Sequence, residues 1–141
     1  MALFSHIYFR IFCYPTEEIH RVKDALLFVA FGETIPDEIN LHEIQTSSVS
    51  KTPIFIYELM LKEKHHINDF LEKIHKHISV SKLEKRIDNK CFLYLRLDKQ
   101  KAYKKRICFS DAGDTIYCKA KIQVYPTKKT VAIKKIRNYF S

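Results

Sequence analysis

The stretch Cys91-Phe92-Leu93-Tyr94-Leu95-Arg96-Leu97 decides the fold. Its odd-numbered residues are all apolar, whereas its even-numbered residues are two aromatic rings and one guanidinium. Successive side chains of a β-strand point to opposite faces of the sheet. The stretch is therefore expected to be a strand with one face for a hydrophobic core and a second face that is aromatic and basic.

The same alternation recurs at residues 6–13 and 115–125. If helices cover one face of the sheet, the other face collects the rings and cations of these strands. That face then carries His6, Tyr8, Arg10, Phe12, Phe92, Tyr94, Arg96, Tyr117, Lys119, Lys121 and Tyr125. Rings stack on unpaired bases and cations bind phosphates, so such a face suits single-stranded nucleic acid. The alternative is that this face packs on another subunit or on a helix.

Helix and strand patterns alternate along the whole chain. The expected strands span residues 6–13, 41–49, 54–61, 91–97, 106–110 and 115–125, and the expected helices run from Thr16 to Gly32, from Lys64 to Ile78, from Ser81 to Ile87 and onward from Thr127. Residues 47–53 and 111–114 are expected to be hairpin turns. Leaving the short third helix aside, the order β-α-β-β-α-β-β-β-α predicts an α+β fold. We expect a two-layer sandwich, an antiparallel sheet with helices packed on one face, in a single domain spanning residues 1–141.

Positive charge is concentrated towards the C-terminal end. The chain has a formal net charge of +9. Residues 99–141 contain twelve Lys and Arg against only Asp111 and Asp114, a net charge of +10, whereas residues 1–98 have a net charge of −1. This asymmetry indicates a polyanionic partner, either nucleic acid or a membrane surface. A solvated lysine-rich face is the alternative.

Two local groups of cations add to the strand residues. Six of the eight residues from Lys99 to Arg106 are basic or tyrosine, which suits either phosphate contact or a solvated connector. Lys128 and Lys129 follow Thr127 at the start of the expected last helix, where the helix dipole disfavours cations unless an anion binds there. Solvent screening is the alternative explanation. The candidate RNA contacts are Tyr8, Arg10, Tyr94, Arg96, Lys99, Lys101, Tyr103, Lys104, Lys105, Arg106, Tyr117, Lys119, Lys121, Lys128 and Lys129.

Several classes of functional site lack their residues in the sequence. With two glycines in the chain, a Gly-rich phosphate loop is excluded. The middle helix carries His65, His66, His75 and His77, but no two of them have the spacing of three or four by which one helix face holds a metal. No nucleophile–histidine–acid set is recognisable. We therefore expect no catalytic residues, no metal and no cofactor.

Cysteines and hydropathy indicate the compartment. Cys13, Cys91, Cys108 and Cys118 all fall on apolar phases of expected strands, so we expect buried thiols in a reducing environment. No apolar run approaches the ~18–20 residues of a membrane span, and the first residues lack the features of a signal peptide. We expect a cytoplasmic protein with no membrane partner.

The longer block from Cys91 to Tyr103 resembles an archaeal family described as RNA-binding proteins or predicted exosome subunits. Further matching parts are residues 12–13, 86–88, 114–116 and 124–126. That family is similar in fold to the ribosomal protein that binds five-S RNA, which implies a two-layer sandwich on an antiparallel sheet. The chain departs from the family at residues 47–54, where members have a Gly-rich and often His-bearing turn.

The residue patterns and the resemblance together predict a non-catalytic RNA-binding protein. It would be an accessory factor in RNA processing, degradation or ribosome assembly. Its expected partners are RNA, an RNA-processing complex and a second copy of itself in a homodimer. The alternative is a protein-interaction module whose aromatic sheet face is buried in a dimer or partner interface.

Overall fold

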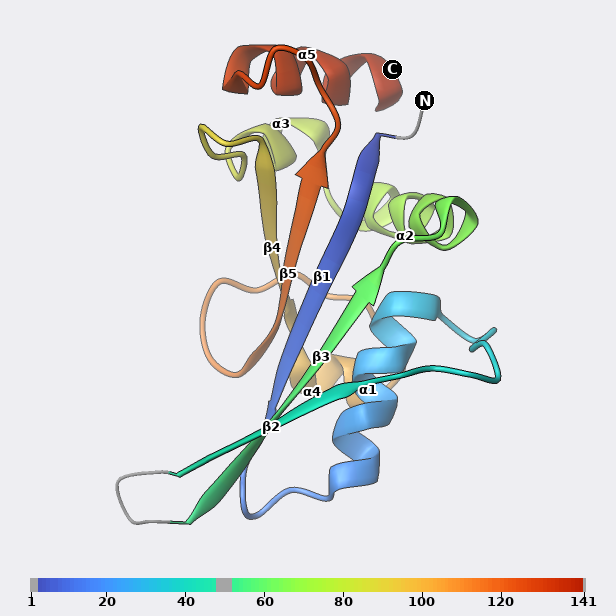
Figure 1. Ribbon diagram of the computed structural model, residues 1–141, viewed down its shortest axis with the longest axis vertical. Helices are drawn as coiled ribbons and strands as arrows, with labels where there is room; N and C mark the ends of the chain where they lie inside the picture. Colours follow the sequence, from blue (N-terminus) through green and yellow to red (C-terminus); the bar gives the residue numbers. More distant parts are fainter. Residues whose placement is uncertain (1–2, 48–51, 141) are drawn as a thin grey trace.

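The molecule is built on one antiparallel sheet (Figure 1). The computed structural model describes residues 3–47 and 52–140, and within them the sheet has five strands in the order β2-β3-β1-β5-β4. The strands are β1 (Phe4–Cys13), β2 (His42–Ser47), β3 (Pro53–Leu61), β4 (Phe92–Asp98) and β5 (Thr115–Ile122), and the helices are α1 (Ile19–Phe31), α2 (Lys64–His77), α3 (Val80–Glu84), α4 (Lys99–Tyr103) and α5 (Lys129–Phe140). The predicted α+β class and antiparallel sheet are confirmed.

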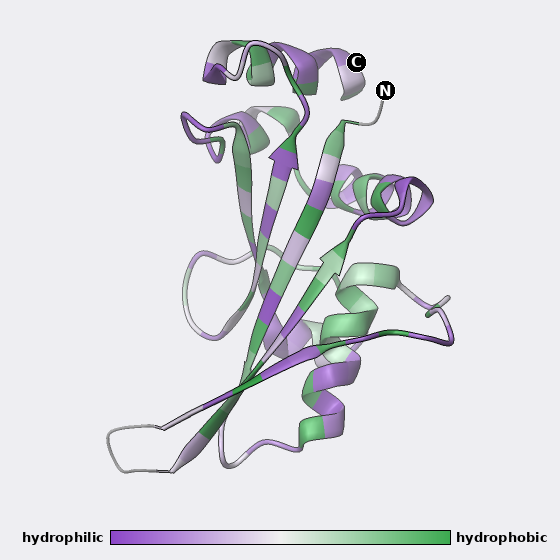
Figure 2. Ribbon diagram, viewed as in Figure 1, coloured by the Kyte–Doolittle hydropathy of each residue, from purple (hydrophilic) through white to green (hydrophobic). Residues whose placement is uncertain are grey.

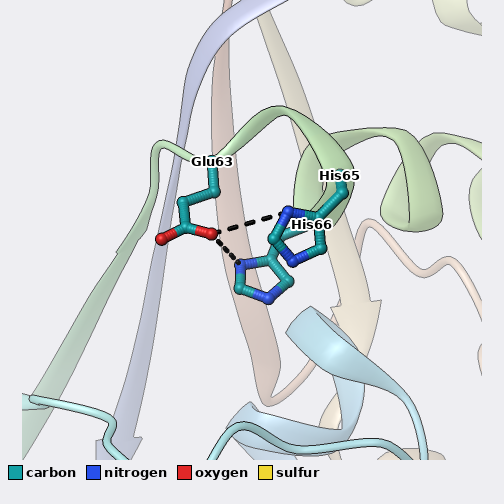
Figure 3. Close-up of side chains that lie close together, drawn as sticks. All are labelled: Glu63, His65 and His66. Carbon is teal, nitrogen blue, oxygen red and sulfur yellow. Dashed lines mark ion pairs between the residues drawn. The ribbon is translucent and has the colours of Figure 1, made fainter.

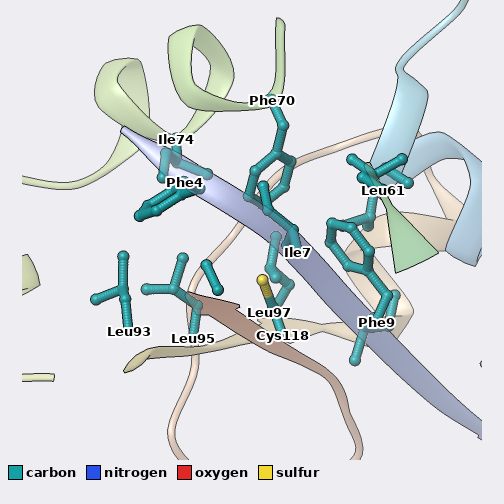
Figure 4. Packing of buried hydrophobic residues seen from close by; sticks show 14 of the residues in the cluster. Phe4, Ile7, Phe9, Leu61, Phe70, Ile74, Leu93, Leu95, Leu97 and Cys118 are labelled. Atoms are coloured by element: carbon teal, nitrogen blue, oxygen red, sulfur yellow. The ribbon is translucent and has the colours of Figure 1, made fainter. Parts of the chain in front are cut away.

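The hydrophobic core lies between one face of the sheet and the helices that cover it. Ile7, Phe9 and Ile11 are fully buried at alternate positions of β1. The ring of Phe70 in α2 meets the ring of Phe9 edge to face, with 5.1 Å between centroids (Figure 4), and Leu26 of α1 is buried in the same cluster. The periodicity of the sequence is therefore the periodicity of burial, and Figure 2 shows it as alternating hydrophobic and hydrophilic segments along β1 and β5.

Helices α3 and α5 lie together at one end of the sheet. In Figure 1, α3 and α5 pack against each other beyond the point where β5 ends. Ala132 and Ile136 are the buried residues of α5, and Arg137 forms an ion pair with Glu84 of α3.

Among the helices described, none has both the length and the apolar character needed to cross a bilayer.

The strand expected at residues 106–110 is wrong. Instead, the chain turns into α4 directly after β4, because the Asp98 carboxylate accepts a 2.9 Å hydrogen bond from the Lys101 amide and caps the helix. The following segment runs back along β4 with only an isolated bridge between Leu97 and Phe109. Cys108 is consequently exposed, contrary to expectation, whereas the other three cysteines are buried as predicted.

The predicted helix starts are also corrected. α1 begins at Ile19, with Glu18 rather than Thr16 at the N-cap position, and α5 begins at Lys129. The reason at α1 is a turn in which the Glu17 amide bonds to the Tyr14 carbonyl and the Glu17 carboxylate accepts from the Tyr14 amide. The hairpin of β2 and β3 is confirmed by its register, in which Ser47 pairs with Pro53 at the ends of the two strands. Of the turn expected at residues 47–53, residues 48–51 lie outside the described residues.

Lys99 is fully buried, which contradicts its assignment as an RNA contact. Its ammonium donates to the Phe12 carbonyl at 2.5 Å and to Glu17 at 2.7 Å, and it lies 3.0 Å from the Asp114 carboxylate. An ammonium has three donors, and these three acceptors match them. Tyr103 also donates to Glu17, at 2.6 Å, so the cluster joins the ends of β1 and β4 to the starts of α1 and β5.

The Lys99 cluster predicts a large cost for removing the ammonium. Lys99→Met should destabilise the protein by about 3–5 kcal/mol, because Glu17 and Asp114 would keep their charges without a buried partner. The exposed neighbour provides the control: Lys101→Met should change the free energy of unfolding by no more than about 0.5 kcal/mol. Denaturant midpoints of both variants measure the difference, and near-equal midpoints would contradict a structural role for Lys99.

Candidate nucleic-acid interface

The sheet face opposite the core aligns aromatic and basic side chains in rows. Strand register places Lys119 of β5 between Tyr8 of β1 and Tyr94 of β4. It likewise places Tyr117 between Arg10 and Arg96. A third row consists of His6, Lys121 and Phe92. Each row thus crosses three strands and alternates rings with cations, and we call these nine residues the open face.

Cations of the open face lie directly over its rings. The Lys119 ammonium is 4.3 Å from the centroid of Phe92, and the Lys121 ammonium is 4.7 Å from the same centroid. The Arg10 guanidinium is 4.5 Å from the centroid of Tyr117. Such cation–π contacts are worth about 0.5–1 kcal/mol at exposed sites. They hold each of these cations against the face of a ring.

Hydrogen bonds to carboxylates fix two of the tyrosines. The Tyr94 hydroxyl donates to Asp88 at 2.9 Å, and the same carboxylate accepts from the amides of Lys90 and Phe92. The Tyr8 hydroxyl donates to Glu58. Burial and then the hydrogen bond to a carboxylate raise the pKa of both hydroxyls to about 12. Both phenols therefore stay protonated well above physiological pH. The hydrogen bonds to Glu58 and Asp88 hold the two rings in defined positions.

The charge of the open face is uneven across the sheet. Burial, followed by the nearby Lys121, Lys62 and Lys119, lowers the pKa of His6. Glu58 on β3 accepts hydrogen bonds from Tyr8 and from His42 of β2, and these bonds lower the pKa of its carboxyl group. The basic surface is therefore bounded by a carboxylate on the β3 side and extends over β1, β5 and β4.

A family model described as RNA binding matches residues 6–122 of the chain. The chain belongs to this RNA-binding family. An RNA-binding protein of Pyrococcus abyssi (strain GE5 / Orsay) is 28% identical over an alignment of 141 positions that covers 95% of this chain and 92% of that protein. A solved DUF54 protein from Methanothermobacter thermautotrophicus is 27% identical and covers 98% of both chains with a TM-score of 0.83. The resemblance to an archaeal RNA-binding family is confirmed.

The region matched by the RNA-binding family contains the whole open face but not α5. Of the candidate RNA contacts, the structure brings seven together on the open face: Tyr8, Arg10, Tyr94, Arg96, Tyr117, Lys119 and Lys121. Lys128 and Lys129 are exposed at the start of α5, beyond the end of the sheet. They therefore lie outside both the open face and the matched region.

The remaining candidates lie on the helical side of the molecule. α4 packs against α1, and the Arg21 guanidinium lies over the Tyr103 ring at 4.9 Å. The ammonium of Lys105 lies 5.3 Å from the ring of Phe28 in α1. The run from Lys101 to Arg106 is thus separated from the open face by the sheet itself. It forms neither part of the rows nor an extension of them.

Sequence reasoning missed two polar residues beside the open face, Glu58 and His42. The β3 strand was expected, and Glu58 falls on its outward phase opposite Arg10. His42 belongs to β2, where all six residues are exposed and the alternation is weak. The signal for Glu58 was therefore present in the strand pattern, whereas that for His42 depended on the β2–β3 register.

One group of metal-ligand side chains lies at the start of α2 (Figure 3). A Glu63 carboxylate oxygen is 3.5 Å from Nδ1 of His65 and 4.0 Å from Nδ1 of His66. One ligand atom from each of the three lies within 4.8 Å of the others. Imidazole and carboxylate suit Zn²⁺ and related ions, so these are the residues of the described chain that could hold one. The spacing of three or four was applied only to pairs of histidines, so it did not reveal Glu63, which lies three residues before His66.

The raised tyrosine pKa values predict an unusual alkaline titration. Near pH 11 the hydroxyls of Tyr8 and Tyr94 should remain largely protonated, whereas a free tyrosine of pKa ~10 ionises. Glu58→Gln should lower the pKa of Tyr8 but leave it above ~10, because burial remains when the carboxylate charge is removed. The chemical shift of the ¹³Cζ nucleus of each ring, followed against pH, measures both values.

The pH dependence of stability follows with a defined sign. The protonated phenols are favoured in the folded state, so their contribution is fully present below the unfolded pKa of ~10 and is lost as pH rises towards 12. In the titration of the Glu58→Gln variant, Tyr94 is the internal control, because the substitution leaves its Asp88 partner unchanged. An unshifted Tyr8 titration in this variant would contradict the hydrogen bond.

Proposed function

We propose that the chain is a non-catalytic protein that binds single-stranded RNA on the open face. Bases would stack on Phe92, Tyr94 and Tyr8, and phosphates would meet Lys119, Lys121 and Arg10. The observation that carries this proposal is the cross-strand register, which interleaves rings and cations at neighbouring positions. Stacking on an aromatic side chain is worth about 1–3 kcal/mol per base.

Unpaired bases fit this surface better than a duplex does. The rings lie half-buried in a sheet rather than on a protruding helix or loop, so a base must be splayed onto them. Single strands and loops offer such bases, whereas an A-form helix keeps its bases stacked inside.

Arg10 strengthens the proposal because its Nε is buried with no hydrogen-bond partner among the described residues. An unmet donor costs about 1–3 kcal/mol, which a phosphate or base oxygen would relieve after a small shift of the side chain.

A protein interface is the second candidate, and it is favoured by a different part of the same sheet surface. Met60 and Ile44, on β3 and β2, are 43% and 37% exposed, and Ile44 pairs with Ile56 in the register. Met60 pairs with Tyr8 of the open face, and Glu58 separates Met60 from Ile56 along β3. A homodimer or a partner within an RNA-processing complex that covered Met60 would therefore also meet the open face at Tyr8. We further propose that the protein is an accessory factor in RNA processing, degradation or ribosome assembly and that it is cytoplasmic.

Tyr94 provides the sharpest test of stacking. Tyr94→Ala should weaken binding to a single-stranded RNA by about 1–3 kcal/mol, or roughly 5- to 150-fold. Tyr94→Phe keeps the ring but loses the bond to Asp88, so its affinity should stay within about twofold. Fluorescence anisotropy measures both affinities, and thermal melting checks that both variants fold. Equal losses in the two variants would show that the hydroxyl, and not the ring, matters.

Lys119 tests the electrostatic part of the proposal. Each phosphate contact to a single strand contributes a slope of about −0.7 to the dependence of log affinity on log salt concentration. Lys119→Gln should therefore make the slope shallower by about 0.7, whereas Lys64→Gln, which removes an exposed charge from α2, should leave it unchanged. A slope that is already flat in the unmodified protein would rule out RNA binding through phosphates.

A further inference from the structure

A basic cavity of about 710 Å³ lies beside β4, beyond the edge of the sheet. Three segments line it: the end of α2, the stretch from Lys82 to Arg86, and residues 107–111. Lys82, Lys85, Arg86 and His77 line the cavity, against Asp111 as its one acidic lining residue. Neither the strand alternation nor the cation run of the sequence pointed to this site. A cavity of this volume falls in the range that holds small ligands, ~300–1,000 Å³.

The cavity begins where the open face ends. The Tyr94 amide donates to the Arg86 carbonyl at 3.0 Å, and the Ser110 amide donates to the Arg96 carbonyl at 3.0 Å. Tyr94 and Arg96 belong to the open face, while Arg86 and Ser110 line the cavity. Two residues of β4 are therefore bonded through the main chain to two of the three segments that line the cavity. Each row of the open face ends on β4, and the outer edge of β4 is bonded to the cavity lining.

The lining combines apolar and cationic parts as a nucleotide site requires. Ile107 and Phe109 are half-buried and pack against the core, so they provide an apolar wall and an aromatic ring. Lys82 and Lys85 are exposed, and neither ammonium has an ion-pair partner among the salt bridges of the described residues. Arg86 is held by Asp111 at 2.5 Å. A base can therefore meet the ring while its phosphate meets free ammonium groups.

We propose that this cavity holds one nucleotide of the RNA strand that crosses the open face. This inference rests on the proposed function, since it assigns the place where the bound strand leaves the sheet. The base packs against Phe109 and Ile107, and the phosphate binds Lys82 and Lys85. Asp111 opposes the phosphate, so the Arg86–Asp111 pair acts against binding until the guanidinium turns towards the ligand.

The inference predicts that the effect of cavity residues depends on RNA length. A strand of about 4 nucleotides fills the three rows, whereas a strand of about 10 nucleotides, within the range of single-strand site sizes, also reaches the cavity. Lys82→Ala with Lys85→Ala should lower the affinity for the longer strand about tenfold and leave the shorter one within about twofold. The control Lys64→Ala with Lys134→Ala removes equal charge from exposed positions outside the cavity and should affect neither.

A second variant tests the same site with the opposite sign. Asp111→Asn removes the only acid of the lining and frees Arg86, so it should raise the affinity for the longer strand about threefold. Asp37→Asn, at an exposed position away from the cavity, should change it by less than half as much. Oligouridylates of both lengths, titrated by fluorescence anisotropy, give all of these affinities, and thermal melting confirms folding.

The outcomes separate this inference from the proposed function. If both lengths bind and Tyr94→Ala weakens them while the cavity variants match their controls, the cavity assignment is wrong and the open face stands. If neither length binds the unmodified protein, the proposed function itself fails. If uridine monophosphate alone binds with dependence on Lys82 and Lys85, and length has no effect, the cavity takes a free nucleotide, which overturns its place on the strand.

Discussion

The buried ammonium of Lys99 is the constraint on which the rest of the architecture depends. A charge leaves water only where acceptors replace its hydration, and here they come from the end of β1, the turn before α1 and the start of β5. These three points must therefore meet behind the sheet at the end of β4. The chain enters α4 at once and returns along the outer edge of β4 instead of forming a hairpin. That return path builds one wall of the basic cavity and leaves the opposite face of the sheet uncovered.

The open face has little freedom, and this bears on how it binds. Lys119 and Lys121 share the ring of Phe92, Arg10 lies over Tyr117, and carboxylates hold the hydroxyls of Tyr8 and Tyr94. A surface whose side chains are already ordered loses less conformational entropy when it binds. The same contacts leave the rings spaced by 6.1–6.5 Å between centroids, in edge-to-face or tilted arrangements. A ligand that provides both planar groups and negative charge can engage both kinds of side chain at once.

The sequence predicts the features that depend on local periodicity and misses those that depend on tertiary partners. Alternation identified β1, β4 and β5 and the seven candidates that share the open face. Lys99 stands among cations, and nothing local distinguishes it from a solvated lysine, because its partner Glu17 is 82 residues away. The stretch 106–110 alternates like a strand, yet β5 already pairs with β1 and β4 on its two sides. The cavity is lined by three separate segments, so no local pattern could reveal it.

Charge along the sequence and charge in space also differ, and the difference explains why periodicity was the better guide. Residues 99–141 carry a net charge of +10, but their cations divide between layers. Lys99 is neutralised inside, Lys101 to Arg106 lie with the helices, and Arg137 pairs with Glu84. Only Lys119 and Lys121 of this region reach the open face. Arg10, Arg96 and the cavity cations come from residues 1–98, whose net charge is −1. A strand separates its faces residue by residue, so phase decides which cations gather into one surface, whereas position in the chain does not.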